Sequence, residues 1–214
     1  MGLVLGVMNS MFYLAISQVP LATVSSIECV GPVVLAAWGA RSARNAIAVG
    51  AAASGALLLT GVRFTGAPSG LVFAFANAIL FGLYVVLGHR IVREGRGRPI
   101  ERLAAAMLIA MVVVSPLGIA AAMPALRNPL LLGAGIGVGV CSSVIPYVCD
   151  QLAMARMSRS TFALMLFMLP ALATMIGALV LRQFPTVTEL LGITLVMGGL
   201  ALHRERRSLA HQNE

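Results

Sequence analysis

Charged side chains are scarce in this sequence. Asp, Glu, Lys and Arg together make up 10% of the 214 residues, while hydrophobic residues make up 59%. A soluble domain of this size usually has about a quarter of its residues charged. So little polar surface cannot cover a water-soluble globule. The composition therefore excludes an ordinary soluble domain and predicts an all-α integral membrane protein that contacts the lipid bilayer.

Lysine is absent, so arginines supply all fifteen cationic side chains and dominate the net charge of +8. These arginines stand between apolar runs rather than along one face, a pattern that argues against a nucleic-acid partner.

Cysteine is also rare. Cys29, Cys141 and Cys149 lie inside apolar runs and show neither a CxxC motif nor metal-ligand spacing. The sequence therefore predicts no metal site and no cofactor.

Long apolar runs are abundant. A helix that crosses the bilayer core needs about 17–25 predominantly apolar residues. Runs of this kind, bounded by Arg, Pro or Gly, predict eight transmembrane helices at 2–17, 20–39, 46–62, 70–88, 103–123, 130–153, 161–181 and 187–203.

The arginines give an independent test of these spans. The loops on the side where the chain starts hold twelve of the fifteen, and the opposite loops hold Arg63, Arg127 and Arg182. Such an excess is typical of cytoplasmic loops. The arginine-only, alanine-rich composition is that of a GC-rich bacterial genome. We therefore predict a multi-pass protein of the bacterial cytoplasmic (inner) membrane with both termini in the cytoplasm.

The sequence contains a weak internal repeat. An offset of 138 residues aligns 14–40 with 152–178, and it pairs Pro32 with Pro170 and Gly39 with Gly177. The first three spans thus resemble the sixth to eighth, an offset of five spans. Because five is odd, the related helices cross the membrane in opposite directions, which is the arrangement of an inverted repeat. This pattern predicts an incomplete first repeat of three helices (1–62), a linker (63–69), a complete second repeat of five helices (70–203) and a cytoplasmic tail (204–214).

Three stretches, 6–36, 79–91 and 142–181, carry a family resemblance. Together they contain Asn9, Tyr13, Glu28-x-x-Gly31-Pro32, Tyr84, Pro146-Tyr147, Asp150, Arg156 and Pro170. In these residues the sequence resembles EamA-type transporters of the drug/metabolite transporter superfamily, and it looks closest to their threonine/homoserine exporter branch. The resemblance implies a fold of ten helices in two inverted five-helix halves, of which this chain would supply eight, as three plus five.

Two acids, Glu28 and Asp150, fall at depth within the predicted spans. Glu28 lies about 12 Å from the outer end of its span, and Asp150 lies about 9 Å from the inner end of its own, at 1.5 Å per residue. An ionised carboxylate at membrane depth costs at least about 2.5–3.5 kcal/mol, so such a group faces a cavity or a partner. Both acids are candidates for substrate binding or proton coupling. The alternative is a structural role between helices.

Other residues could complete a cavity. Asn9, Tyr13, Tyr84 and Tyr147 are candidate polar groups for the same substrate, with ordinary packing as the alternative. Three prolines lie inside predicted spans, namely Pro32, Pro146 and Pro170. They predict hinges or broken helices, in which backbone carbonyls without a helical partner could line a site. Simple kinks are the alternative. The glycine-rich stretches at 50–55 and 133–139 predict close helix contacts. His89, beside Arg90, is expected to lie at the membrane interface.

Taken together, these features predict a secondary transporter that exports small amino acids or related metabolites by alternating access, with protons as the coupling ion. Two alternatives stay open. One is a truncated, transport-inactive or structural membrane protein, and the other is an intramembrane enzyme, which has no GxGD or HExxH motif in its favour. The expected partners are a small-molecule substrate and protons. A homo-oligomer is left open.

Overall fold

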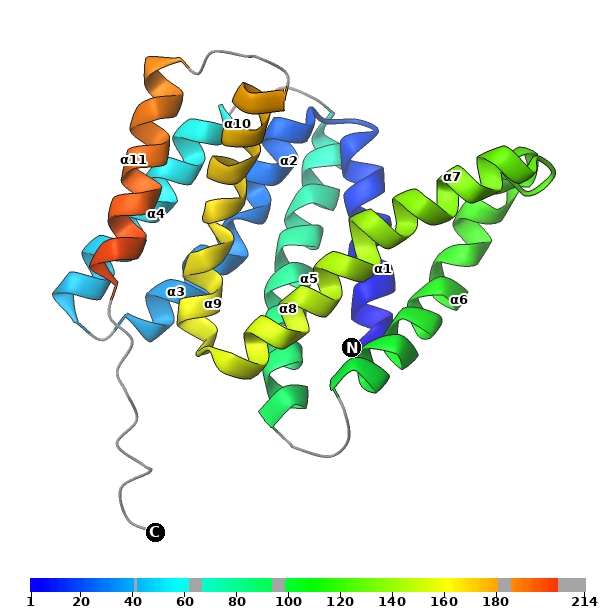
Figure 1. The fold of residues 1–214 in the computed structure, drawn as a ribbon, viewed down its shortest axis with the longest axis horizontal. Coiled ribbons are helices and arrows are strands. Elements are labelled where there is room, and N and C mark those ends of the chain that lie inside the picture. Colours follow the sequence, from blue (N-terminus) through cyan, green and yellow to red (C-terminus); the bar gives the residue numbers. More distant parts are fainter. Residues whose placement is uncertain (41, 62–66, 94–98, 181–185, 204–214) are drawn as a thin grey trace, which may run out of the picture. The chain divides into compact units, whose positions relative to one another are not determined.

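The computed structural model describes residues 1–40, 42–61, 67–93, 99–180 and 186–203, and within these ranges it holds helices and turns without a strand (Figure 1). The helices are α1 (Gly2–Ile16), α2 (Leu21–Glu28), α3 (Val30–Gly39), α4 (Ala43–Thr60), α5 (Pro68–Arg93), α6 (Pro99–Leu126), α7 (Pro129–Gly139), the π-helical turn η1 (Val140–Val144), α8 (Ile145–Arg156), α9 (Arg159–Leu166), α10 (Met168–Val180) and α11 (Val187–Leu202). The all-helical prediction is confirmed.

Five helical stretches of the described chain are long and apolar enough to cross a membrane. They are Leu21–Gly39, Ala43–Thr60, Pro68–Arg93, Pro129–Arg156 and Arg159–Ile176, and α1 and α11 are shorter apolar helices. This finding agrees with a membrane protein. The count of eight spans remains a prediction.

Capping side chains explain where several helices begin. The Ser42 hydroxyl accepts a hydrogen bond from the Asn45 amide at the start of α4, and Asn128 caps α7 directly before Pro129. Thr186 and Glu189 form a reciprocal capping box on α11. Each cap satisfies backbone N–H groups that have no partner within the helix. Gly61 then ends α4 in the left-handed conformation, with φ of 58°, which glycine adopts without steric cost.

Two helices are interrupted at matching places. α2 ends at Glu28, four residues before Pro32, and α3 starts at Val30, two residues before it. In the same way, α9 ends at Leu166, four residues before Pro170, and α10 starts at Met168, two residues before it. Proline lacks the N–H that would bond to the carbonyl four residues earlier. The two interruptions lie 138 residues apart, which is the offset of the sequence repeat.

A third irregularity precedes Pro146. The chain passes from α7 through η1 into α8 without a break, and Pro146 is the second residue of α8. A π-helical turn inserts one extra residue into a helix and so rotates the next turns about the helix axis. It therefore sets the direction in which the side chains of α8 point.

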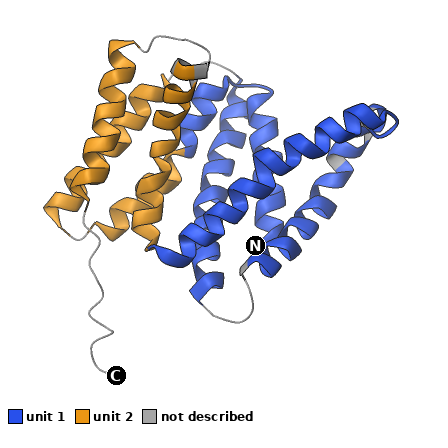
Figure 2. Ribbon diagram, viewed as in Figure 1, with its two compact units in different colours: residues 1–28, 65–157 blue, residues 29–64, 158–214 orange. Residues whose placement is uncertain are grey.

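The described helices form two compact units, which Figure 2 shows in different colours. Unit 1 comprises residues 1–28 and 65–157, and unit 2 comprises residues 29–64 and 158–214. In unit 1, α1 packs against α5 and α6, while α5 also contacts α2 and α8. One of its cores consists of Ala15, Val19, Val24, Ile27, Ala74 and Ala78. The division into repeats at 1–62 and 70–203 rests on sequence similarity and remains a prediction.

In unit 2, α4 packs along α11, and α3 packs along α9. The first contact depends on small residues. A Cβ atom at Gly55 would lie 2.5 Å from the Gly192 carbonyl oxygen, and one at Gly199 would lie 2.6 Å from that of Ala48. The close contact expected of the stretch 50–55 is therefore present. The expectation for 133–139 is wrong for the described chain, because a Cβ atom at any of its four glycines would meet nothing within 4 Å.

Candidate functional site

Four polar side chains of unit 1 form a connected group that we call the Asp150 cluster. It consists of Asn9 on α1, Tyr84 on α5, and Tyr147 and Asp150 on α8. The Tyr84 hydroxyl donates to Asp150 Oδ2 at 3.4 Å. Asn9 Nδ2 lies 3.2 Å from the Tyr147 hydroxyl, and that hydroxyl lies 3.4 Å from Asn9 Oδ1.

Helix periodicity explains how these side chains meet. Tyr147 and Asp150 are three residues apart on α8, so they lie on one face of that helix. The Tyr84 and Tyr147 rings meet edge to face, with centroids 5.7 Å apart. This contact joins the two hydrogen-bonded pairs. Phe81, one turn before Tyr84, stacks on its ring at 6.2 Å and so holds it on the side facing α8.

The cluster offers a defined chemistry within apolar helices. Asp150 supplies a carboxylate, the two tyrosines supply hydroxyls that both donate and accept, and Asn9 supplies an amide. Tyr84 is fully buried, and Asn9, Tyr147 and Asp150 are half-buried. Such a group can accept hydrogen bonds from an ammonium group and exchange them with a neighbouring polar group. Within the described residues, no three His, Cys, Asp or Glu side chains are placed to hold a metal ion.

Glu28 belongs to a separate pair. Asn77 Nδ2 on α5 donates to Glu28 Oε1 at 3.0 Å, and this bond joins α2 to α5. Asn77 is fully buried. Asn77 and Tyr84 are seven residues apart on α5, which places them on the same face about 10 Å from each other along the helix. Both acids of the predicted spans therefore bond to side chains of α5.

The structure brings four of the six predicted polar site residues into one cluster and places Glu28 in a pair of its own. Tyr13 is 65% exposed and packs edge-on against Phe12. It also interacts electrostatically with Tyr147 of the cluster, and its role in the site remains a prediction. Pro32 and Pro170 follow helix interruptions, and Pro146 follows the π-helical turn. The side chain of His89 is buried, and its Nδ1 lies 3.0 Å from the Val85 carbonyl oxygen; its position at the membrane interface remains a prediction.

Sequence reasoning missed two buried amides, Asn77 and Gln151. A signal existed for both. Each is an amide inside an apolar helix, where a polar side chain needs a hydrogen-bonding partner. Gln151 directly follows Asp150, and its side-chain Nε2 lies beside Gly88.

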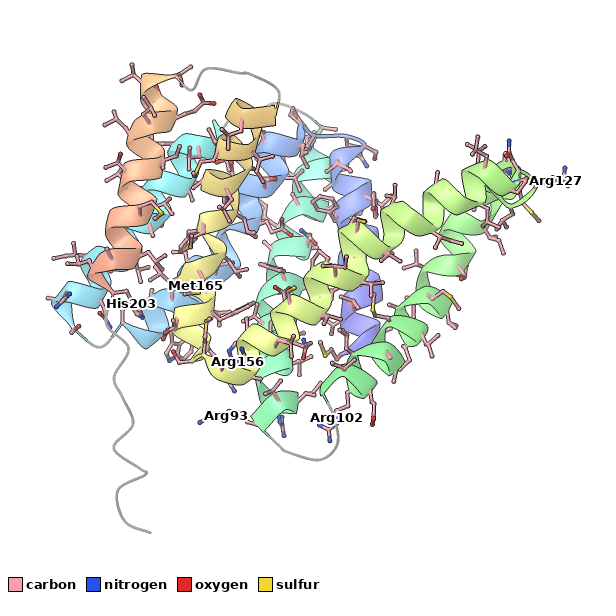
Figure 3. The ribbon with its side chains drawn as sticks, viewed as in Figure 1. Arg93, Arg102, Arg127, Arg156, Met165 and His203 are labelled. Atoms are coloured by element: carbon pink, nitrogen blue, oxygen red, sulfur yellow. The ribbon has the colours of Figure 1, made fainter. Side chains whose placement is uncertain are left out.

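Arginines mark the two ends of unit 1. Arg93 closes α5, Arg102 stands in the first turns of α6, and Arg156 closes α8. All three lie at one end of the unit, and Arg127, between α6 and α7, lies at the other (Figure 3). The predicted cytoplasmic side corresponds to the end with three arginines.

Known proteins resemble this chain in sequence and in fold. A family model described as the EamA-like transporter family matches residues 68–204. The chain is 30% identical over 203 residues to the threonine/homoserine exporter RhtA of Salmonella typhimurium, and 29% identical over 199 residues to RhtA of Escherichia coli K12. Each match covers 92% of this chain and 66% of the relative, so the chain spans just under two thirds of their length.

A crystal structure of a protein with 20% sequence identity superposes with a TM-score of 0.73, over 92% of this chain and 73% of that one. This likeness supports the helical fold. The match to residues 68–204 extends over more than half of the sequence and includes α5 and α8, which carry Tyr84, Tyr147 and Asp150. The chain belongs to the EamA-like transporter family.

Proposed function

We propose that this protein exports small amino acids or related metabolites, such as threonine and homoserine, across the bacterial inner membrane. Export is driven by protons and proceeds by alternating access. The observation that carries the proposal is the Asp150 cluster, in which a carboxylate, two phenols and an amide from three helices meet among apolar segments. Likeness to the two exporters supports the class of substrate.

The chemistry of the cluster suits one end of an amino acid. The Asp150 carboxylate attracts the substrate's ammonium group, and hydrogen bonds that involve a charged group are stronger than neutral ones. The hydroxyls of Tyr84 and Tyr147 can rotate to donate to or accept from the substrate. Tyr84 and Asn9 hold Asp150 and Tyr147 in place before the substrate arrives, which lowers the cost of ordering them on binding.

The alternative of an intramembrane enzyme finds less support. An aspartyl pair requires two carboxyl groups that share one proton. Asp150 bonds to Tyr84, whereas Glu28 bonds to Asn77 two helical turns away along α5. The two acids therefore occupy separate polar groups.

Efflux from proteoliposomes tests the proposal. Vesicles that contain the protein are loaded with radiolabelled threonine or homoserine, and efflux is followed under an imposed pH gradient. We expect gradient-dependent efflux by the wild type and at least a tenfold loss in Asp150→Asn, because a hydrogen bond to a charged group contributes about 1.5–3 kcal/mol.

Glu189→Gln is the matched control. It also neutralises a carboxylate, but Glu189 is a half-buried capping residue at the start of α11 in unit 2, outside the Asp150 cluster, and glutamine serves equally in a capping box. Its efflux should equal that of the wild type. Efflux that is absent from the wild type, or that is the same in Asp150→Asn, would contradict the proposed function.

A further inference from the structure

The Glu28–Asn77 pair contains an unused acceptor. Asn77 Nδ2 donates to Glu28 Oε1 at 3.0 Å, but Asn77 Oδ1 has no hydrogen-bond partner in the described chain although the side chain is fully buried. Leaving such a group unsatisfied costs about 1–3 kcal/mol. A donor is therefore missing next to the Glu28 carboxyl group.

A proton on Glu28 supplies that donor. The neutral acid has one O–H group and one carbonyl oxygen, and a primary amide has N–H groups and one carbonyl oxygen. The two groups can then pair reciprocally: the amide N–H donates to the acid carbonyl, and the acid O–H donates to Asn77 Oδ1. The last torsion of a glutamate side chain is broad, so the carboxyl group can turn to make both bonds.

The surroundings favour the neutral acid over the ionised one. α1 and α5 pack against α2, which carries Glu28. The ionisable side chains of α1 and α5 are Tyr13, Tyr84, His89, Arg90 and Arg93, and Cys29 follows Glu28 directly in the chain. Tyr147 on α8 also interacts electrostatically with Glu28. Arg90 is thirteen residues beyond Asn77 on α5, about 20 Å along the helix. The arginines of α5 are thus too distant to pair with an ionised Glu28.

We propose that Glu28 takes up and releases a proton within the membrane, and that Asn77 is the positioning residue that holds the protonated form through a reciprocal acid–amide pair. This inference deepens the proposed function, on which it rests, because it assigns the coupling proton to Glu28 and leaves Asp150 to the substrate. Release of the proton removes one of the two bonds between α2 and α5. The proton thereby changes how these two helices are joined.

Infrared difference spectroscopy during a pH titration tests the pair in the protein reconstituted in lipid. The wild type should show the carbonyl stretch of a neutral carboxylic acid that is lost in Glu28→Gln. In Asn77→Leu the band should move to higher frequency, because both hydrogen bonds of the acid are lost. Gln18→Leu removes a different amide of unit 1, one that accepts a hydrogen bond from the Ser69 hydroxyl, and should leave the frequency of the band unchanged.

A second variant covers the case in which Asn77→Leu does not fold. Asn77→Asp places two carboxyl groups together, and because like charges disfavour ionisation the Glu28 band should persist to higher pH than in the wild type. The proposal is overturned if no Glu28-dependent band exists at any pH, if the band is identical in Asn77→Leu, or if Asn77→Asp leaves its midpoint unchanged. These readouts do not require transport, so failed efflux would contradict the proposed function and leave the acid–amide pair intact.

Discussion

Tyr147 is the residue through which the cluster holds together. Its hydroxyl exchanges hydrogen bonds with Asn9 on α1, and its ring meets that of Tyr84 on α5. One side chain thus connects three helices of unit 1. Its hydroxyl and its ring have different roles, and these can be separated by a substitution that removes only the hydroxyl.

Tyr147→Phe should lower the free energy of unfolding by only about 0.6 kcal/mol, the average for a hydrogen bond between membrane helices. Asn9 keeps a second bond, since its Nδ2 also donates to the Leu5 carbonyl oxygen at 2.9 Å. Efflux of threonine should nevertheless fall severalfold, because the substrate loses a hydroxyl partner. Unfolding in detergent and efflux from vesicles measure the two effects. A loss of stability with unchanged efflux would assign Tyr147 a purely structural role.

The sequence predicted these residues unevenly, for a physical reason. Glu28 and Asp150 could be found because a carboxylate in an apolar run is costly wherever it points. Asn77 carries a smaller penalty, and its importance depends on Glu28 lying opposite, 49 positions away in the chain. Such pairing is a tertiary property. The same limit applies to Tyr13, since the sequence places it in a helix without showing which face is covered.

At the scale of helices, the closest packing in unit 2 is that of α4 against α11. Gly55, Gly192 and Gly199 allow the two backbones to approach, and Ala48 and Ala52 complete the contact. Membrane helices associate through such small residues because lipid offers no hydrophobic force to drive them together.

Gly55→Ala should therefore destabilise unit 2 by about 1–3 kcal/mol, the usual cost of overpacking. Gly50 lies on the same helix, and a Cβ atom there meets nothing within 4 Å. Gly50→Ala should instead stabilise the helix by about 0.5–1 kcal/mol. Thermal unfolding followed by circular dichroism distinguishes the two variants. Equal melting temperatures would mean that α4 and α11 do not pack through Gly55.

Helix positions and interruptions were more predictable than side-chain contacts. Pro32 and Pro170 predicted irregularities in their helices because a missing N–H acts locally, whereas a hinge or site role for them remains a prediction. The π-helical turn before Pro146 was not anticipated, since a proline near a helix start is compatible with several backbone arrangements. The glycines at 133–139 were misjudged for a related reason: small residues permit a close contact but do not supply the partner.

At the scale of the whole molecule, unit 1 combines the two polar groups that transport would need. The Asp150 cluster and the Glu28–Asn77 pair share α5. With the roles that we propose for them, a substrate group and a proton group on one helix allow the binding of either ligand to affect the binding of the other. Coupled export depends on such a link.

Equilibrium binding of radiolabelled threonine and homoserine to the protein in lipid tests most directly whether the Asp150 cluster holds the substrate. We predict saturable binding by the wild type and by Glu189→Gln, and at least tenfold weaker binding by Asp150→Asn, which corresponds to about 1.4 kcal/mol. Equal affinity in Asp150→Asn and the wild type would contradict a substrate site at this cluster.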